Sequence, residues 1–200
     1  ALLQTYPVLP LRQLALLPGM MLSVDVGRKS SVQLLEQVSQ NKDARLLVAT
    51  QLDSEVEDPA QEDLSPVGVE AEIVKLIRVG ADRYTLVVKG LDRHFFSIVQ
   101  SAPFLVATLT PVESNMPDVA LLSIHVEEVK QAARRWVLLS GESGDSLNRI
   151  LNEITDPLRL ADMVSVPLDL SFPEQLELLG ELDEIARLKK VHQHLLRAID

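Results

Sequence analysis

The chain has 200 residues, of which 46% are hydrophobic, so it can bury the core of one large domain or of two small ones. Its net charge of −10 argues against nucleic acid as the main partner, because phosphate binding requires a basic surface. The absence of cysteine excludes disulfides, thiol catalysis and cysteine-bound zinc. No apolar run approaches the ~18 residues of a membrane span, and we expect a cytoplasmic protein without a membrane partner.

The segment from Pro7 to Met20 (PVLPLRQLALLPGM) carries three prolines and one glycine among leucines. Proline in a strand is confined to edges, strand starts and bulges, because it has no N–H to donate. We therefore predict a bent edge strand that is interrupted at Pro10. The dipeptide Pro18-Gly19 fits a type II turn, since proline presets φ at one central position and glycine accepts a positive φ at the next. A second strand is expected over residues 20–26.

The rest of the first half is predicted to hold one short helix and several strands. Ser30 and Gln33 have the spacing of a capping box, which places the start of a helix at Ser30. Gly90-Leu91-Asp92 indicates a turn between two strands. Further strands are expected over residues 45–51, 67–79, 84–88, 94–100 and 103–112. Short strands at about ten-residue spacing favour a small twisted sheet or a partly closed barrel.

The hydrophobic period changes after Met116, and apolar residues then recur at helical spacing. This half is predicted to contain four helices. Asp118, Asp156 and Ser171 are the candidate N-caps, because their side chains can accept hydrogen bonds from the first helical turn. The last helix is expected to run from Ser171 to Ile199.

These patterns together predict an α+β chain in two parts. The β-rich part is assigned to residues 1–115 and the all-α part to residues 116–200. Both parts carry more acidic than basic residues, so neither is expected to be a module for anionic ligands.

Several patterns that suggest chemistry have a plainer structural interpretation. Residues 27–31 (GRKSS) lack the upstream glycine of a phosphate loop, and they fit a strand that leads into a helix. Residues 141–144 (GESG) are one residue short of a nucleophile elbow and join two helices. The four histidines do not have metalloprotease spacing, and the acidic run 53–63 lacks the glycine of a calcium loop. We therefore predict no catalytic residue, no metal site and no cofactor.

The chain resembles the Lon protease N-terminal (substrate-binding) domain family in several motifs that occur in the family's order. The opening PVLPLR strand, the PGM turn and the segment 26–28 (VGR) carry the first part of the likeness. Further similar segments are 46–51 (LLVATQ), 67–71 (VGVEA), 84–93 (YTLVVKGLDR) and 160–163 (LADM). The chain departs from the family pattern at Leu158, where the family often has glycine, and at Lys89, where it often has an acid.

The resemblance implies a β-rich pseudo-barrel of PUA-like type, followed by a helical bundle with a long terminal helix. It also implies a non-catalytic domain for substrate recognition and assembly in a Lon-type ATP-dependent protease. Such a domain would serve protein quality control by binding unfolded or degron-bearing proteins, and self-association or a hexamer is expected of the parent protease. The ATPase and Ser-Lys protease modules of that family are not found in these residues. The alternative is a stand-alone domain that binds a small ligand or a short peptide degron in a pocket of the β-rich part.

Candidate contact residues follow from this expectation. Methionine and aromatic side chains on a sheet adapt to varied apolar partners. The residues singled out for substrate binding are Tyr6, Leu9, Leu11, Met20 and Met21. A possible contact loop comprises Glu55, Glu57 and Asp58, whose acidic character would disfavour acidic clients.

Overall fold

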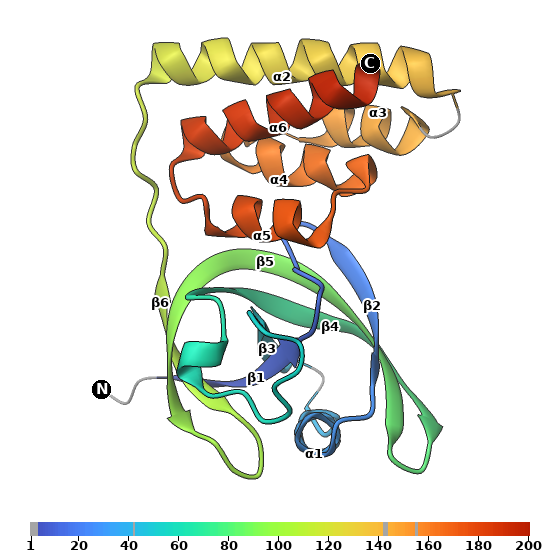
Figure 1. The fold of residues 1–200 in the computed structure, drawn as a ribbon, viewed down its shortest axis with the longest axis vertical. Coiled ribbons are helices and arrows are strands. Elements are labelled where there is room, and N and C mark those ends of the chain that lie inside the picture. The colour runs from blue at the N-terminus through green and yellow to red at the C-terminus, as the bar shows by residue number, and fades with distance from the viewer. Residues whose placement is uncertain (1–3, 42, 142–143, 155) are drawn as a thin grey trace. The chain divides into compact units, whose positions relative to one another are not determined.

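The computed structural model describes residues 4–41, 43–141, 144–154 and 156–200 (Figure 1). The chain divides into two compact units, Ala1–Val112 and Glu113–Asp200. The first contains a six-stranded sheet and helix α1 (Lys29–Val38), and the second is built from helices. This arrangement confirms the α+β class.

The sheet of the β-rich unit closes on itself. Its strands lie in the order β2-β5-β4-β3-β1-β6, and β6 pairs in addition with β5, so five strands form a ring and β2 extends it along β5. Figure 1 shows β5 as a long bent strand, which lets one half of it pair with β2 and the other half with β6. The predicted pseudo-barrel is therefore confirmed. The strands are β1 (Thr5–Leu11), β2 (Met21–Val26), β3 (Arg45–Thr50), β4 (Val67–Gly80), β5 (Arg83–Gln100) and β6 (Val106–Pro111).

Strand β1 is a member of the ring and has a paired strand on each side, so the prediction of an edge strand was wrong. It pairs with β6 in antiparallel fashion through Thr5–Pro7 and with β3 in parallel through Val8–Leu11. The prolines are tolerated because each half of β1 forms backbone hydrogen bonds mainly with one of its two neighbouring strands. Val8 N donates toward β6, to Leu105 O at 2.8 Å. Backbone N–H groups two residues apart point to the same neighbouring strand, so the nitrogen of Pro10 faces the same side as Val8 N. At Pro10 strand β6 has already ended, so no hydrogen bond of the sheet is lost there.

The Pro18-Gly19 turn has the predicted geometry. Gly19 has a φ of 83°, and Met20 N donates to Leu17 O at 3.1 Å, which closes a type II turn. The turn docks on β5 through Gly19 N to Gly90 O and Gly90 N to Met20 O, both at 2.9 Å. Gly90 is thus part of a continuous strand, and the turn predicted at residues 90–92 was wrong. Gly90 has no side chain, so the backbone of the Pro18-Gly19 turn can come close to β5 at this position; Gly90 does not reverse the chain.

Helix α1 begins one residue before the position that the capping-box pattern indicated. Arg28 occupies the N-cap position, and no side chain caps the helix there. The first turn also contains no acidic residue. The prediction that Ser30 caps this helix was therefore wrong, and the helix is held by the buried apolar residues on one face, which include Leu34 and Leu35.

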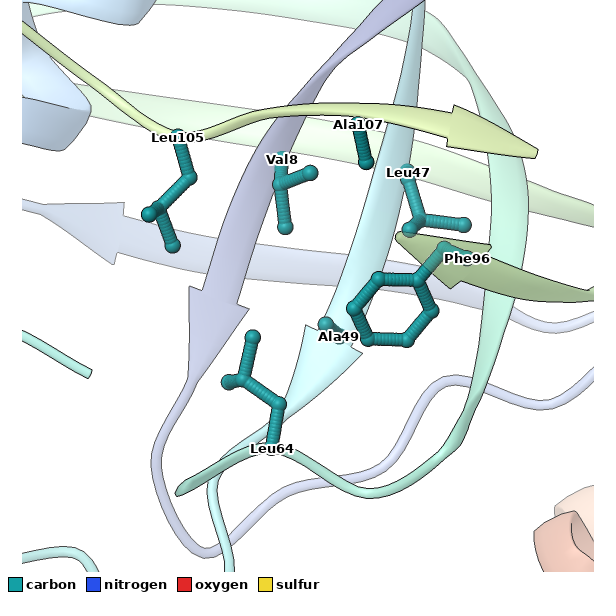
Figure 2. Close-up of a cluster of buried hydrophobic side chains, with 7 residues drawn as sticks. All are labelled: Val8, Leu47, Ala49, Leu64, Phe96, Leu105 and Ala107. Atoms are coloured by element: carbon teal, nitrogen blue, oxygen red, sulfur yellow. The ribbon is translucent and has the colours of Figure 1, made fainter. Parts of the chain in front are cut away.

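One cluster of buried side chains fills the ring between β1, β3, β5 and β6. Figure 2 shows these side chains pointing toward one another from strands and from the segments next to them. The only aromatic member is Phe96, so the cluster is mostly aliphatic. Its members are Val8, Leu47, Ala49, Leu64, Phe96, Leu105 and Ala107.

The helical unit begins with α2 (Val119–Ser140), the longest helix of the chain. Asp118 caps it as predicted, since its Oδ1 accepts from Leu121 N at 2.9 Å. The helix α3 (Gly144–Glu153) follows, and then α4 (Leu160–Ser165), which is flanked by single turns of 3₁₀ helix.

The last predicted helix is two helices in the structure. Helix α5 (Phe172–Gly180) has the predicted capping box of Ser171 and Glu174 at its start. A new helix, α6 (Glu184–Ile199), begins after Asp183, whose Oδ1 accepts from Ala186 N at 3.0 Å. The helical spacing of leucines continues across this break, which is why periodicity alone does not reveal it.

The cap of α5 yields a prediction about pH. Two hydrogen bonds with Ser171, followed by the interaction with Arg197, lower the pKa of Glu174 from 4.5 to about 2. A carboxylate with a lowered pKa stabilises the folded state fully above its unfolded pKa, and this contribution is lost as pH falls through about 2. We expect the urea midpoint of the helical unit to fall between pH 5 and 2.

The measurement follows the fluorescence of Trp136, the only tryptophan, which lies in α2. Glu174→Gln is expected to have a lower midpoint at pH 5 and a smaller decrease on acidification. Equal pH slopes for the parent and this variant would show that the cap does not carry the effect.

Candidate functional site

Tyr6 lies at a cavity of the β-rich unit. The cavity has a volume of about 870 Å³ and is lined by polar and apolar residues from β1, α1, β3, β4 and the segment before β6. Tyr6 is half-buried there. Burial, and secondly the charge of Glu70, raises its pKa above 10.0, so the phenol is neutral and can donate a hydrogen bond.

Glu70, in the wall of this cavity, interacts with three polar side chains. Its Oε1 accepts from Arg45 Nη1 at 3.4 Å, and its Oε2 lies 3.2 Å from His94 Nε2. Tyr6 also forms a side-chain hydrogen bond to Glu70. This carboxylate is therefore satisfied by protein donors, and the cluster holds β1, β3, β4 and β5 together. Glu70 is not among the residues predicted from the sequence, although a glutamate within an apolar strand is itself a signal of such a network.

Leu9 and Leu11 belong to the core of the β-rich unit. Leu9 is 2% exposed and Leu11 is 7% exposed, since both side chains are packed where β1 pairs with β3. In this structure neither side chain forms part of an outer contact surface. Alternating burial along a strand cannot be assigned to a face from one sequence when both faces are apolar.

The two methionines after the Pro18-Gly19 turn differ in exposure. Met20 is half-buried, and its backbone is committed to the turn and to Gly90. Met21 begins β2 and is 56% exposed. Of the five apolar residues that we singled out, Met21 therefore presents the most accessible side chain.

Met21 lies on the outer face of the sheet formed by β2, β5 and β4. The strand register pairs Met21 with Lys89, Ser23 with Val87, and Thr85 with both Asp25 and Ile77. Met21, Val87 and Ile77 consequently follow one diagonal across the three strands, on the same face. We call these three residues the outer apolar diagonal. Val74 and Val79, at irregularities of β4, are also exposed.

The acidic loop is folded against the end of β1 and β3. Gln51 Nε2 donates to Asp53 O at 3.2 Å and to Val56 O at 2.9 Å, and Arg12 Nη2 donates to Val56 O at 3.4 Å. These bonds use backbone carbonyls and do not engage the carboxylates of Glu55, Glu57 and Asp58. Glu55, Glu57 and Asp58 are all exposed.

The described part of the chain holds no group of three or more histidine, cysteine, aspartate or glutamate side chains that could bind a metal ion. Within the same residues, none of the helices combines the length and apolar character that crossing a membrane requires. The GESG pattern includes residues 142 and 143, which lie outside the described residues.

Comparison with known proteins places the chain in a family. The profile of the ATP-dependent protease La (LON) substrate-binding domain matches residues 5–197. The chain is 36% identical to Lon protease 2 of Myxococcus xanthus over 199 residues, which cover 97% of this chain and 24% of that protein. It is 34% identical to the Lon protease of Anaeromyxobacter dehalogenans over 194 residues, or 96% of this chain and 23% of that protein. The chain thus spans about a quarter of the length of these relatives.

The fold is also that of a solved domain. The N-terminal domain of Mycobacterium avium complex Lon protease superposes with a TM-score of 0.75 at 22% identity, covering 96% of this chain and 98% of that one. The order of motifs, the ring-shaped sheet with its helical unit, and the family match over nearly the whole chain lead to one conclusion. The chain belongs to the LON substrate-binding domain family of ATP-dependent protease La.

Proposed function

We propose that this chain recognises substrates for a Lon-type ATP-dependent protease by binding exposed apolar segments of unfolded or degron-bearing proteins. The observation that carries the proposal is the outer apolar diagonal of Met21, Val87 and Ile77, with Met21 more than half exposed. A methionine and two branched aliphatic side chains can contact many apolar sequences without selecting one.

The surroundings of the diagonal favour weak and reversible contacts. Polar or charged residues flank it in the register, including Ser23, Lys75 and Lys89. A small apolar area within a polar surface releases its ligand readily. Several such contacts along one unfolded chain together give a higher overall affinity than any single contact. In this proposal the exposed acids of residues 55–58 disfavour acidic clients by repulsion.

The test uses a double variant, Met21→Ser with Ile77→Ser, which removes the two ends of the diagonal at exposed positions. We expect binding of a reduced, carboxymethylated model protein to weaken by about threefold to tenfold, because apolar contact area is lost. Binding is measured by fluorescence anisotropy with the 200-residue chain.

The matched control is Met116→Ser, where the methionine is 84% exposed and belongs to the helical unit. This variant is expected to bind as the parent does, and circular dichroism establishes that each variant is folded. Equal binding by the double variant and the control would contradict apolar capture by the diagonal.

A second candidate function is the binding of a small polar ligand or a short peptide in the cavity beside Tyr6. Its volume of about 870 Å³ lies within the range of small-molecule sites. Gln37, Asn41 and Gln100 supply amide groups to its lining. A fragment screen by NMR that perturbs the Tyr6 and Gln37 signals together would favour this function, and an absence of such hits would leave it without support.

The wider setting is part of the same proposal. We propose that the chain works in the cytoplasm, next to the ATPase and protease modules of a Lon-type enzyme. Its helical unit then links it to those modules or to further copies of itself, and the apolar residues exposed on α2, Leu121, Ile124, Leu138 and Leu139, support this role.

A further inference from the structure

A second cavity of the β-rich unit lies between the end of β1, strand β2 and the start of α1. Its volume is about 410 Å³. Leu9, Leu11 and Leu14 and the valines of β2 provide apolar lining, whereas Arg12 and Arg28 bring two guanidinium groups. We call this cavity the arginine pocket. It is a cationic site on a chain whose net charge is −10.

Neither Nη1 of Arg28 nor Nη2 of Arg12 is hydrogen-bonded to a carboxylate. Nη1 of Arg28 is buried and has no hydrogen-bond acceptor among the described residues. Arg12 donates to a carbonyl, Val56 O at 3.4 Å, and not to a carboxylate. Asp25 is the acidic member of the described lining, and its Oδ1 accepts from Thr85 Oγ1 at 3.3 Å. A buried donor atom without an acceptor, on the half-buried side chain of Arg28, forms a strong charge-assisted hydrogen bond when an anionic acceptor binds.

Two further features support an anion at this place. Burial, followed by the positive charge of Arg12, lowers the pKa of Arg28, which indicates that the cation is incompletely compensated. Ser31 from the uncapped first turn of α1 also lines the pocket, and helix N-termini favour negative charge. The negative charge of Asp58 raises the pKa of Arg28 and offsets part of the positive charge. Because of this partial compensation, the site suits a singly charged anion better than a phosphate.

We propose that the arginine pocket binds the free α-carboxylate at the C-terminus of an unfolded chain, with the terminal apolar side chain packed against Leu14, the half-buried leucine of the lining. A carboxylate attached to an apolar side chain matches a lining that is apolar apart from the arginines and a few small polar groups. Because Nη1 is covered in the unliganded chain, the Arg28 guanidinium turns to meet the carboxylate oxygens. The inference rests on the proposed function, and it adds a preference for chain ends to the capture of apolar segments.

The experiment compares two eight-residue peptides of the same uncharged sequence that end in leucine, one as the free acid and one as the C-terminal amide. We expect the 200-residue chain to bind the free acid about tenfold more tightly than the amide, because a charge-assisted hydrogen bond contributes a difference in affinity of this size. Arg28→Gln and Arg12→Gln are each expected to reduce this ratio toward one. Arg149→Gln, an exposed arginine of α3, is the charge-matched control and keeps the ratio.

The outcomes separate this inference from the function on which it rests. Equal binding of acid and amide peptides, with the carboxymethylated protein still bound, overturns the carboxylate site and leaves apolar capture intact. Loss of binding to both peptides and to the unfolded protein contradicts both proposals. Displacement of the peptide by inorganic phosphate but not by acetate identifies a phosphate site and overturns the inference. If circular dichroism shows that Arg28→Gln is not folded, the result for Arg12→Gln tests the inference, because Arg12 is exposed and its substitution is not expected to disturb the fold.

Discussion

Replacing Leu47 with alanine is expected to lower the free energy of unfolding of the β-rich unit by about 2–5 kcal/mol. Leu47 is 0% exposed and belongs to the cluster in Figure 2. It lies between Val8 of β1 and Glu70 of β4 in the register, so its loss leaves a cavity where three strands meet. Gly68 adds to the tightness, because a Cβ there would come within 2.9 Å of the Leu47 side chain.

Hydrogen exchange of the β3 and β4 amides measures this effect. Exchange is preferred over fluorescence because the only tryptophan, Trp136, lies in the other unit. The control is Leu52→Ala, where the leucine is 53% exposed and the cost is expected to be small. Similar protection losses for both variants would show that the buried cluster does not dominate the stability of this unit.

The second large effect is expected for Gly90→Ala. An added Cβ would lie 2.5 Å from Leu17 O, a backbone atom that the Pro18-Gly19 turn holds in place. Relieving that contact must disturb the two hydrogen bonds by which the turn docks on β5. Overpacking of this kind costs about 1–3 kcal/mol, and the amides of Gly19 and Met20 are expected to lose protection first.

Gly80→Ala is the matched control, because the nearest atom to its added Cβ is 3.6 Å away. We expect this variant to retain the stability of the parent within about 1 kcal/mol. Unchanged exchange at Gly19 in Gly90→Ala would contradict the role given to Gly90.

The candidate contact residues show where sequence reasoning stops. Met21 and Leu9 are both apolar residues of predicted strands, but only Met21 has an accessible side chain. Tyr6 lies at a cavity whose other walls come from residues up to about a hundred positions away in the chain, such as Gln100 and Phe104. Exposure and cavity walls depend on which strands become neighbours, and that is not a property of any single segment.

Sequence alone was sufficient for features governed by short-range chemistry. The Pro18-Gly19 turn, the Asp118 cap and the capping box of Ser171 and Glu174 each depend on a few adjacent residues, and all three are confirmed. The change from strand to helix periodicity and the ordered family motifs were also readable, so the fold class and the family followed from them.

Only the tertiary structure decided that β1 lies inside the ring, that Gly90 continues β5, and that the arginine pocket forms between β1, β2 and α1. Closure of the ring depends on β6 pairing with both β1 and β5. The physical reason is that closing a sheet is a cooperative choice among long-range pairings, whose free energy is spread over the whole unit, whereas a cap or a turn is determined within a few residues.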